Sequence, residues 1–182
     1  MADPMGATGR RQGKRTRAVV RPTSSRVRMA LFNMLAAFEF REPRVLDLYS
    51  GLGTLGKEAL ANGAASCDFV ESNAKLCESL KADLAQAGLQ DRSRVLCMRV
   101  EKALGVLPGP YDIVVMDPPY DSPDLEQVVS RLAKEGHIAP RGLLVVEHSK
   151  HVALSESYGG LKRWRSRRYG DTVLDIYVRG EA

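Results

Sequence analysis

Three glycines, followed by an acid twenty residues after the first, have the types and spacing needed to bind a nucleoside. Gly51, Gly53 and Gly56 form a GxGxxG pattern between a short apolar run and a segment with helical periodicity. Glycines at such a strand-to-helix turn let the backbone approach a ligand closely and let the helix pack tightly on the strand. Glu71 lies 20 residues after Gly51, at the end of the next apolar run. A carboxylate there can accept hydrogen bonds from both hydroxyls of a ribose, so the pattern predicts a nucleoside cofactor.

Asp47 helps to distinguish two cofactors that share this geometry, a nicotinamide dinucleotide and S-adenosylmethionine. Its carboxylate lies four residues before the first glycine. It would repel a pyrophosphate at the glycine turn, whereas it would attract the ammonium and sulfonium groups of S-adenosylmethionine. An aspartate at a strand end can also be a simple local cap. We favour S-adenosylmethionine, and the predicted cofactor-binding residues are Asp47, Tyr49, Ser50, Gly51, Gly53, Gly56 and Glu71.

A second motif, Asp117-Pro118-Pro119-Tyr120, could hold an exocyclic amino group of a nucleobase. Two successive prolines fix φ and remove two backbone donors, so this stiff loop can only accept hydrogen bonds from an amine. Asp117 and the Pro118 carbonyl would orient the amine for attack on a sulfonium methyl, and Asp117 could accept the released proton. Tyr120 could stack on the base, which is worth about 1–3 kcal/mol. We predict Asp117, Pro118, Pro119 and Tyr120 as catalytic residues; the alternative is an ordinary strand-ending turn.

Both motifs require strands that end at one edge of a sheet. Helical patterns alternate with apolar runs and predict a doubly wound parallel sheet covered on both faces. Two further runs, joined by a turn and not by a helix, predict a C-terminal antiparallel hairpin. The expected fold is a Rossmann-like α/β class I fold with seven strands. The expected strands are 44–49, 67–70, 95–98, 113–116, 143–147, 161–168 and 172–178, and the expected helices are 23–37, 54–62, 73–87, 101–107 and 125–134.

Positive charge is concentrated at the start of the chain. Residues 1–28 contain eight basic side chains and one acidic side chain, whereas the remainder contains 19 basic and 21 acidic ones. We expect a basic flexible arm over 1–20, because it has too few apolar residues to fold alone, and one catalytic domain over 21–182. Such an arm suits a polyanion, and a solvated tail is the simpler alternative. The predicted RNA-binding residues are Arg10, Arg11, Lys14, Arg15, Arg17, Arg21, Arg26 and Arg28. If the arm is only a solvated tail, the RNA-binding surface would instead comprise the segment from Arg21 to Arg28 together with Lys162, Arg163 and Arg165.

Composition excludes several other classes of protein. The three cysteines are spaced 10 and 20 apart, which matches neither a disulfide framework nor a metal knuckle, so we expect reduced thiols and no bound metal. No apolar run approaches the roughly 20 residues that span a bilayer, and no signal peptide is evident. We expect a cytoplasmic protein without a membrane partner. The histidines, His137, His148 and His151, are expected on the surface or in loops.

Taken together, these segments resemble the RsmD-type 16S ribosomal RNA guanine-N2 methyltransferases, a family within the class I S-adenosylmethionine-dependent fold. The glycine turn and the Asp-Pro-Pro-Tyr motif occur in many methyltransferases, whereas the Arg-Pro-Thr segment that begins at Arg21 is the more specific marker. The resemblance spans residues 21–178. The matching segments are 21–28, 31–33, 46–53, 55–56, 58–60, 63–65, 70–71, 117–120 and 169–172.

The resemblance implies methyl transfer to N2 of a guanine in 16S rRNA, within a 30S subunit or an assembly intermediate, by a monomer. It also implies that Asp47, Glu71 and the three glycines surround the cofactor. The chain departs from the family in having a short arm where a basic β-hairpin usually stands, in Leu52 between the glycines, and in Arg99 after the third strand. The alternatives are methylation of a DNA adenine, a protein glutamine or a small molecule, and a non-catalytic nucleoside-binding regulator.

Overall fold

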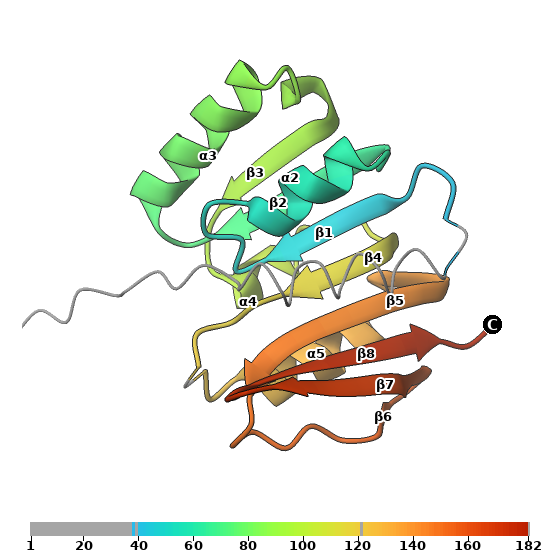
Figure 1. The fold of residues 1–182 in the computed structure, drawn as a ribbon. Coiled ribbons are helices and arrows are strands. Elements are labelled where there is room, and N and C mark those ends of the chain that lie inside the picture. Colours follow the sequence, from blue (N-terminus) through green and yellow to red (C-terminus); the bar gives the residue numbers. More distant parts are fainter. Residues whose placement is uncertain (1–37, 39, 121, 182) are drawn as a thin grey trace, which may run out of the picture.

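The computed structural model of this protein describes Phe38 and residues 40–120 and 122–181. In Figure 1 these residues form a twisted sheet with helices on both sides. The helix expected over 23–37 and the basic arm expected over 1–20 lie outside the described residues.

All seven expected strands are present, and the Rossmann-like fold class is confirmed. The strands join one sheet in the order β3-β2-β1-β4-β5-β8-β7-β6. Pairing is parallel from β3 to β5 and antiparallel from β5 to β6. The bounds are β1 (Arg44–Leu48), β2 (Ser66–Glu71), β3 (Ser93–Cys97), β4 (Tyr111–Met116), β5 (Ile138–Ser149), β6 (Ser157–Tyr158), β7 (Leu161–Tyr169) and β8 (Thr172–Arg179).

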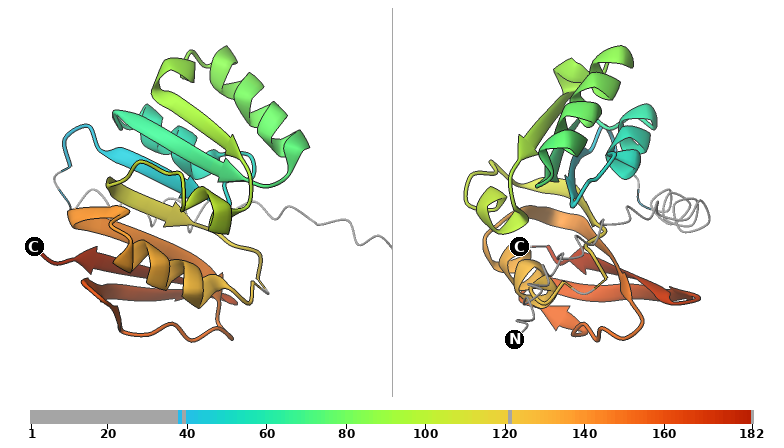
Figure 2. Two further views of the ribbon diagram at one scale, coloured as in Figure 1. Left: turned by 180° about the vertical axis from the view of Figure 1, so that it is seen from behind. Right: turned by 90° about the vertical axis from the view of Figure 1, so that its left-hand side faces the viewer.

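Helices lie on both faces of the sheet (Figure 2). The sheet separates two apolar core clusters. Side chains of α2 and α3 pack on one face, which we call the α2 face, and those of α4 and α5 pack on the other, the α5 face. None of the helices in the described ranges is long and apolar enough to cross a membrane. Their bounds are α2 (Thr54–Ala61), α3 (Ala74–Gln86), α4 (Val100–Ala103) and α5 (Leu125–Lys134), with a short 3₁₀ helix over Gln90–Arg92.

Strand order reverses between β1 and β4, and this reversal positions the site. The chain runs outward from β1 to β2 and β3, then returns to place β4 on the other side of β1. In such sheets, ligands bind outside the carboxyl ends of the strands at the point of reversal. Leu48 pairs with both Val70 of β2 and Met116 of β4. The residues that follow these three strand ends, including both predicted motifs, therefore meet at one edge.

The largest differences from the sequence expectation concern β5, α4 and β6, while other ends shift by one or two residues. Strand β5 begins five residues early, at Ile138, because Ile138 pairs with Tyr111 before a shift in register. Helix α4 ends at Ala103 and not at 107. Strand β6 is an additional two-residue strand at the edge of the sheet. Tertiary pairing that local periodicity does not encode explains the first and third differences.

Candidate cofactor and target site

The glycine turn connects β1 to α2 through backbone conformations that favour glycine. Gly51 and Gly53 have φ of 55° and 68°, in the left-handed region. The turn is closed by hydrogen bonds from the Gly53 amide to the Ser50 carbonyl and from the Ser50 amide to the Val70 carbonyl, at 2.7 and 3.0 Å. The turn is therefore attached to the end of β2.

The three glycines of the motif have different surroundings. A Cβ built on Gly56 would lie 2.3 Å from the buried ring of Phe69, and one on Gly53 would lie 2.4 Å from Leu80. These two glycines let α2 and its turn pack closely on β2 and α3. A Cβ on Gly51 would meet no atom within 4 Å, so Gly51 faces open space where a ligand can approach the backbone. The geometry shows that Gly53 and Gly56 are needed for close packing, whereas their contact with a cofactor stays a prediction.

Asp47 is buried in β1, with 2% of its surface exposed. One oxygen of its carboxylate accepts a hydrogen bond of 2.9 Å from the Gly56 amide, which holds the start of α2. The pKa of Asp47 is raised to about 7, chiefly by burial and also by the charges of Asp117 and Glu71, against the lowering effect of that hydrogen bond. Three carboxylates thus act on one another at the strand ends. A ligand cation placed there would relieve this repulsion.

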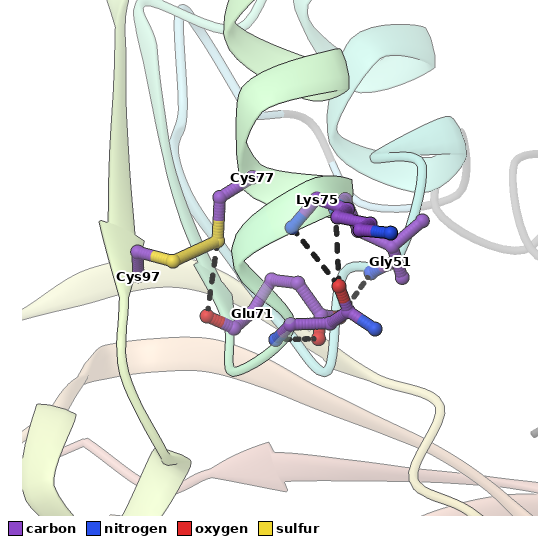
Figure 3. Close-up of a disulfide and its surroundings, with 7 residues drawn as sticks. Gly51, Glu71, Lys75, Cys77 and Cys97 are labelled. Carbon is purple, nitrogen blue, oxygen red and sulfur yellow. Dashed lines mark hydrogen bonds between the residues drawn. A yellow bond between two sulfur atoms is a disulfide. The ribbon is translucent and has the colours of Figure 1, made fainter.

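Glu71, the last residue of β2, holds two backbone amides with its carboxylate (Figure 3). One oxygen accepts from the Gly51 amide at 2.9 Å, and the other accepts from the Asn73 amide at 2.7 Å. Asn73 in turn caps α3 by accepting from the Lys75 and Leu76 amides. Because a carboxylate oxygen has two lone-pair sites, both oxygens can also accept from a ligand hydroxyl. The carboxylate is therefore held in place beside Gly51.

The expectation that all three cysteines are free thiols is wrong for two of them. Cys77, in the first turn of α3, and Cys97, the last residue of β3, form a disulfide (Figure 3). The Cys77 sulfur also lies 3.3 Å from the carbonyl oxygen of Glu71. Cys67 is free and buried. Cys97 pairs with Glu71 across β2 and β3, and the Cys77 sulfur contacts the Glu71 carbonyl, so the two sulfurs lie together. Sequence spacing alone does not show this proximity.

The Asp-Pro-Pro-Tyr motif follows β4, directly beside the glycine turn. Asp117 is half-buried, Pro118 is buried, and Pro119 and Tyr120 are exposed. The Tyr120 hydroxyl lies 2.5 Å from the hydroxyl of Thr172 at the β7–β8 turn. The loop therefore presents the Tyr120 ring at the surface while the hairpin holds its hydroxyl end.

A cavity of about 430 Å³ joins the two motifs at the carboxyl ends of the strands. Its lining includes Tyr49, Glu71 and Pro119, all of which were predicted to belong to the site. Sequence reasoning did not assign Met98 to the site, although its position after the third strand is a usable signal. Residues 99–101 also line the cavity. Arg99, at which the chain departs from the family pattern, therefore lies in the wall of the cavity. The Ser50 hydroxyl oxygen is buried without a hydrogen-bond partner in the described part of the chain.

Several other predicted positions need correction or lie outside this region. His148 is buried within β5, which corrects its expected place, whereas His137 is buried in the loop between α5 and β5 and His151 is exposed as expected. His148 is within 3.2 Å of the buried Asp175 carboxylate. The eight predicted RNA-binding residues lie outside the described residues, so their contacts stay predictions: Arg10, Arg11, Lys14, Arg15, Arg17, Arg21, Arg26 and Arg28.

Comparison with known proteins identifies the family. The family described as "Conserved hypothetical protein 95" matches residues 6–178. The "Putative rRNA methyltransferase YlbH" of Bacillus subtilis is 31% identical over 177 residues, covering 93% of this chain and 96% of that protein. The chain belongs to this family, the RsmD-type methyltransferases.

Two further members of the RsmD-type family support this assignment. "Ribosomal RNA small subunit methyltransferase D" of Escherichia coli K12 is 31% identical over 162 residues, covering 88% of this chain and 80% of that protein. The structure titled "Putative methyltransferase yhhF from Escherichia coli" superposes with a TM-score of 0.78 at 29% identity, covering 88% of each chain. The agreement of fold and sequence over this length confirms the resemblance drawn from the motifs.

Proposed function

We propose that this chain transfers a methyl group from S-adenosylmethionine to the exocyclic N2 of a guanine in 16S rRNA, as a monomer acting on a 30S subunit or an assembly intermediate. The observation that carries the proposal is the single cavity lined by both Glu71 and Pro119. This cavity supports the proposal, because the carboxylate that we expect to bind ribose and the loop that we expect to bind the amine both contribute to its lining. The names of the relatives supply the substrate class, since two of them are described as rRNA methyltransferases.

Glu71, which lines the cavity, and the neighbouring residues of β1 and the glycine turn fit S-adenosylmethionine. The Glu71 carboxylate would hold the ribose hydroxyls, the open side of Gly51 would admit the cofactor, and the partnerless Ser50 hydroxyl offers a further hydrogen bond. The acidic surroundings of Asp47 suit the cationic methionine end. When bound, this cofactor supplies a methyl group on a positively charged sulfur.

Asp117 and the loop after it would act on the target amine. An exocyclic nitrogen shares its lone pair with the ring, so it is a weak nucleophile until hydrogen-bond acceptors orient it. The Asp117 carboxylate and the Pro118 carbonyl would accept the two N–H bonds and favour a pyramidal nitrogen. Asp117 would then take the proton that the amine loses on methylation. The rest of the rate enhancement would come from positioning the amine in line with the methyl group, which can lower the activation barrier by about 7–11 kcal/mol.

A substrate comparison tests this proposal. Labelled S-adenosylmethionine is incubated with undermethylated 30S subunits, naked 16S rRNA, DNA and a mixed protein fraction. We expect label in the rRNA, with 30S subunits or naked rRNA as the better substrate according to the assembly state required. Label in DNA or protein alone would assign the chain to another amine, and cofactor binding without any transfer would favour a nucleoside-binding regulator.

Changing Asp47 to asparagine should make cofactor affinity less dependent on pH. The Asp47 pKa of about 7 means that the wild-type carboxylate gains a proton as pH falls from 8 to 6. The attraction for the cationic cofactor is then lost, so wild-type affinity should fall over this range. Asp47→Asn keeps an acceptor for the Gly56 amide and has no charge to lose. Calorimetric titration should show that the variant binds more weakly than wild type at pH 8 and that its affinity changes less between pH 6 and pH 8, and parallel pH dependence in both proteins would contradict the role of Asp47.

The same substitution should raise the stability of the cofactor-free protein at pH 8. The folded pKa of Asp47 lies above its ordinary value of 3.8, so the unfolded chain holds the ionised form more favourably. The cost to folding therefore begins above pH 3.8 and grows until pH reaches about 7. Thermal unfolding should show a higher Tm for Asp47→Asn at pH 8 and little difference from wild type at pH 4.

Tyr120 should affect RNA binding through its ring more than through its hydroxyl. Tyr120→Ala removes a stacking surface worth about 1–3 kcal/mol per base, which corresponds to roughly 5–150-fold in affinity. Tyr120→Phe keeps the ring and removes the hydroxyl that contacts Thr172. We expect a raised KM for RNA in Tyr120→Ala and a change of a few-fold at most in Tyr120→Phe, with Thr172→Val as the matched control. Equal effects of the alanine and phenylalanine variants would exclude stacking.

A further inference from the structure

One face of strand β7 carries basic and aromatic side chains. The strand sequence, LKRWRSRRY, contains five basic residues and no acidic residue. The register shifts between Arg163 and Arg165, and beyond this bulge Arg165 pairs with Ile176. Directly paired side chains share a face, and Ile176 belongs to the core cluster on the α2 face. Trp164 lies on the same side, because its ring contacts Phe38, which lines the apolar cavity on that face. The bulge thus places Trp164 and Arg165 together.

Further residues extend this surface along the strand. Arg167 pairs with Leu174, another residue of the core cluster on the α2 face, and Lys162 lies on the same side as Val178. We call the side chains of Lys162, Trp164, Arg165 and Arg167 the β7 face. All four are exposed, and 43% of the Trp164 surface is accessible. Within the described ranges, no ion pair neutralises the three cations of the β7 face.

Arg163 does not belong to this surface, which corrects its assignment to a possible RNA-binding group. It pairs with Tyr177 and points to the α5 face. Its guanidinium donates to the buried Asp175 at 3.0 Å and to Glu156 at 2.8 Å. Arg163 is therefore neutralised within the protein. The neighbouring Arg165 differs, since its guanidinium lies over the Trp164 ring at 4.4 Å from the centroid.

The β7 face leads to the residue that we propose stacks on the target base. Strand β7 ends at Tyr169, which pairs with Thr172 across the turn, and the Thr172 hydroxyl contacts that of Tyr120. Arg167 lies two residues before this end and Arg165 four residues before it. Alternate residues of a strand are about 7 Å apart, similar to the spacing of successive phosphates in an extended nucleic acid.

We propose that the β7 face binds the phosphate backbone of the RNA strand that carries the target guanine, and so aligns that guanine with Tyr120. This inference rests on the proposed function, because it names where the substrate of the same site is held. A strip of cations without acids favours a polyanion, and an exposed Trp164 among them can stack on a base. The Phe38 ring packs against Trp164, with 5.0 Å between the ring centroids.

A different role for the same charges is protection of a sheet edge. Strand β6 pairs with Leu161 and Lys162, and the Arg163 amide donates to the Glu156 carbonyl. Among the described residues, no strand pairs with the outer edge of β7 beyond Arg163. Basic side chains and bulges commonly prevent such edges from pairing with other molecules. This role predicts that removal of Arg165 and Arg167 causes aggregation and leaves RNA binding unchanged.

The test compares two variants that each lose two positive charges. Arg165→Gln/Arg167→Gln alters the β7 face, and Lys81→Gln/Lys134→Gln removes exposed lysines from α3 and α5 as the matched control. Binding to undermethylated 30S subunits and to 16S rRNA is measured at several salt concentrations, together with KM, kcat, cofactor affinity and Tm. A third variant, Arg165→Lys/Arg167→Lys, keeps the charge for phosphate contacts.

We expect the β7 variant to bind RNA more weakly, with the slope of log affinity against log salt reduced by roughly 1.4–1.8 for two lost contacts. Its KM for RNA should rise while kcat, cofactor affinity and Tm stay near wild type, and the lysine variant should recover most of the binding. If the wild-type protein methylates rRNA and the β7 variant matches the control, this inference is overturned and the proposed function stands. If the wild-type protein neither binds nor methylates rRNA, both fail.

Discussion

Replacing Asp117 by alanine should reduce methyl transfer by about 10²–10⁴-fold, the usual contribution of a positioned acid or base. Asp117 follows β4 directly, and its charge acts on the buried Asp47, so it lies at the junction of the cofactor and target regions. The alanine variant would lack both the acceptor that orients the amine and the group that takes its proton. Single-turnover methylation of saturating rRNA substrate measures the loss.

Cofactor binding should survive the change at Asp117. Removing this charge lowers the pKa of Asp47, because the two carboxylates repel each other, and calorimetry should therefore show affinity within a few-fold of wild type. Asp117→Asn separates the two proposed roles, since it keeps a carbonyl acceptor and cannot take a proton. Normal turnover in Asp117→Ala would show that the proposed chemistry is wrong.

Replacing Glu71 by alanine should weaken S-adenosylmethionine binding by about 1.5–3 kcal/mol, or roughly 10–150-fold. The ribose would lose a charged acceptor. The Gly51 and Asn73 amides would lose the carboxylate that they share, so the glycine turn would also be held less firmly. Glu78→Ala, at an exposed position of α3, is the matched control and should bind normally.

The direct contact can be separated from the effect on the turn by changing the ligand as well. S-adenosylhomocysteine and its 2′-deoxy analogue are compared on wild type and on Glu71→Ala. If Glu71 binds the ribose, the analogue should bind wild type more weakly, and this difference should largely disappear in the variant. An equal difference in both proteins would limit Glu71 to holding the turn.

Much of the fold follows from the order of local patterns. The expected strand over 44–49 exceeds β1 by one residue, and the predicted helix over 125–134 has the observed bounds of α5. These elements can be recognised from the local sequence. A strand buried on both faces appears as a continuous apolar run, and a helix buried on one stripe repeats its apolar residues with helical spacing. Strand β6 and the early start of β5 depend on partners distant in sequence, so periodicity does not show them.

The candidate site could be predicted in its residue types and less well in its contacts. Gly51 and Glu71 are recognisable from spacing, and the structure adds that one binds the other. Nothing in the sequence shows that Asp47 is buried, because its neighbours in space come from β2, β4 and the start of α2. The local sequence also does not predict the contact between Arg163 and Asp175, because strand pairing decides which face of the sheet each side chain occupies.

The most direct test is the identity of the methylated nucleoside. Undermethylated 30S subunits are incubated with the wild-type protein and labelled S-adenosylmethionine, the 16S rRNA is digested to nucleosides, and each labelled product is identified by mass spectrometry. We expect label in N2-methylguanosine alone, and about 10²–10⁴-fold slower labelling when Asp117→Ala replaces the wild-type protein. Label in any other nucleoside, or equal N2-methylguanosine with the variant, would contradict this expectation.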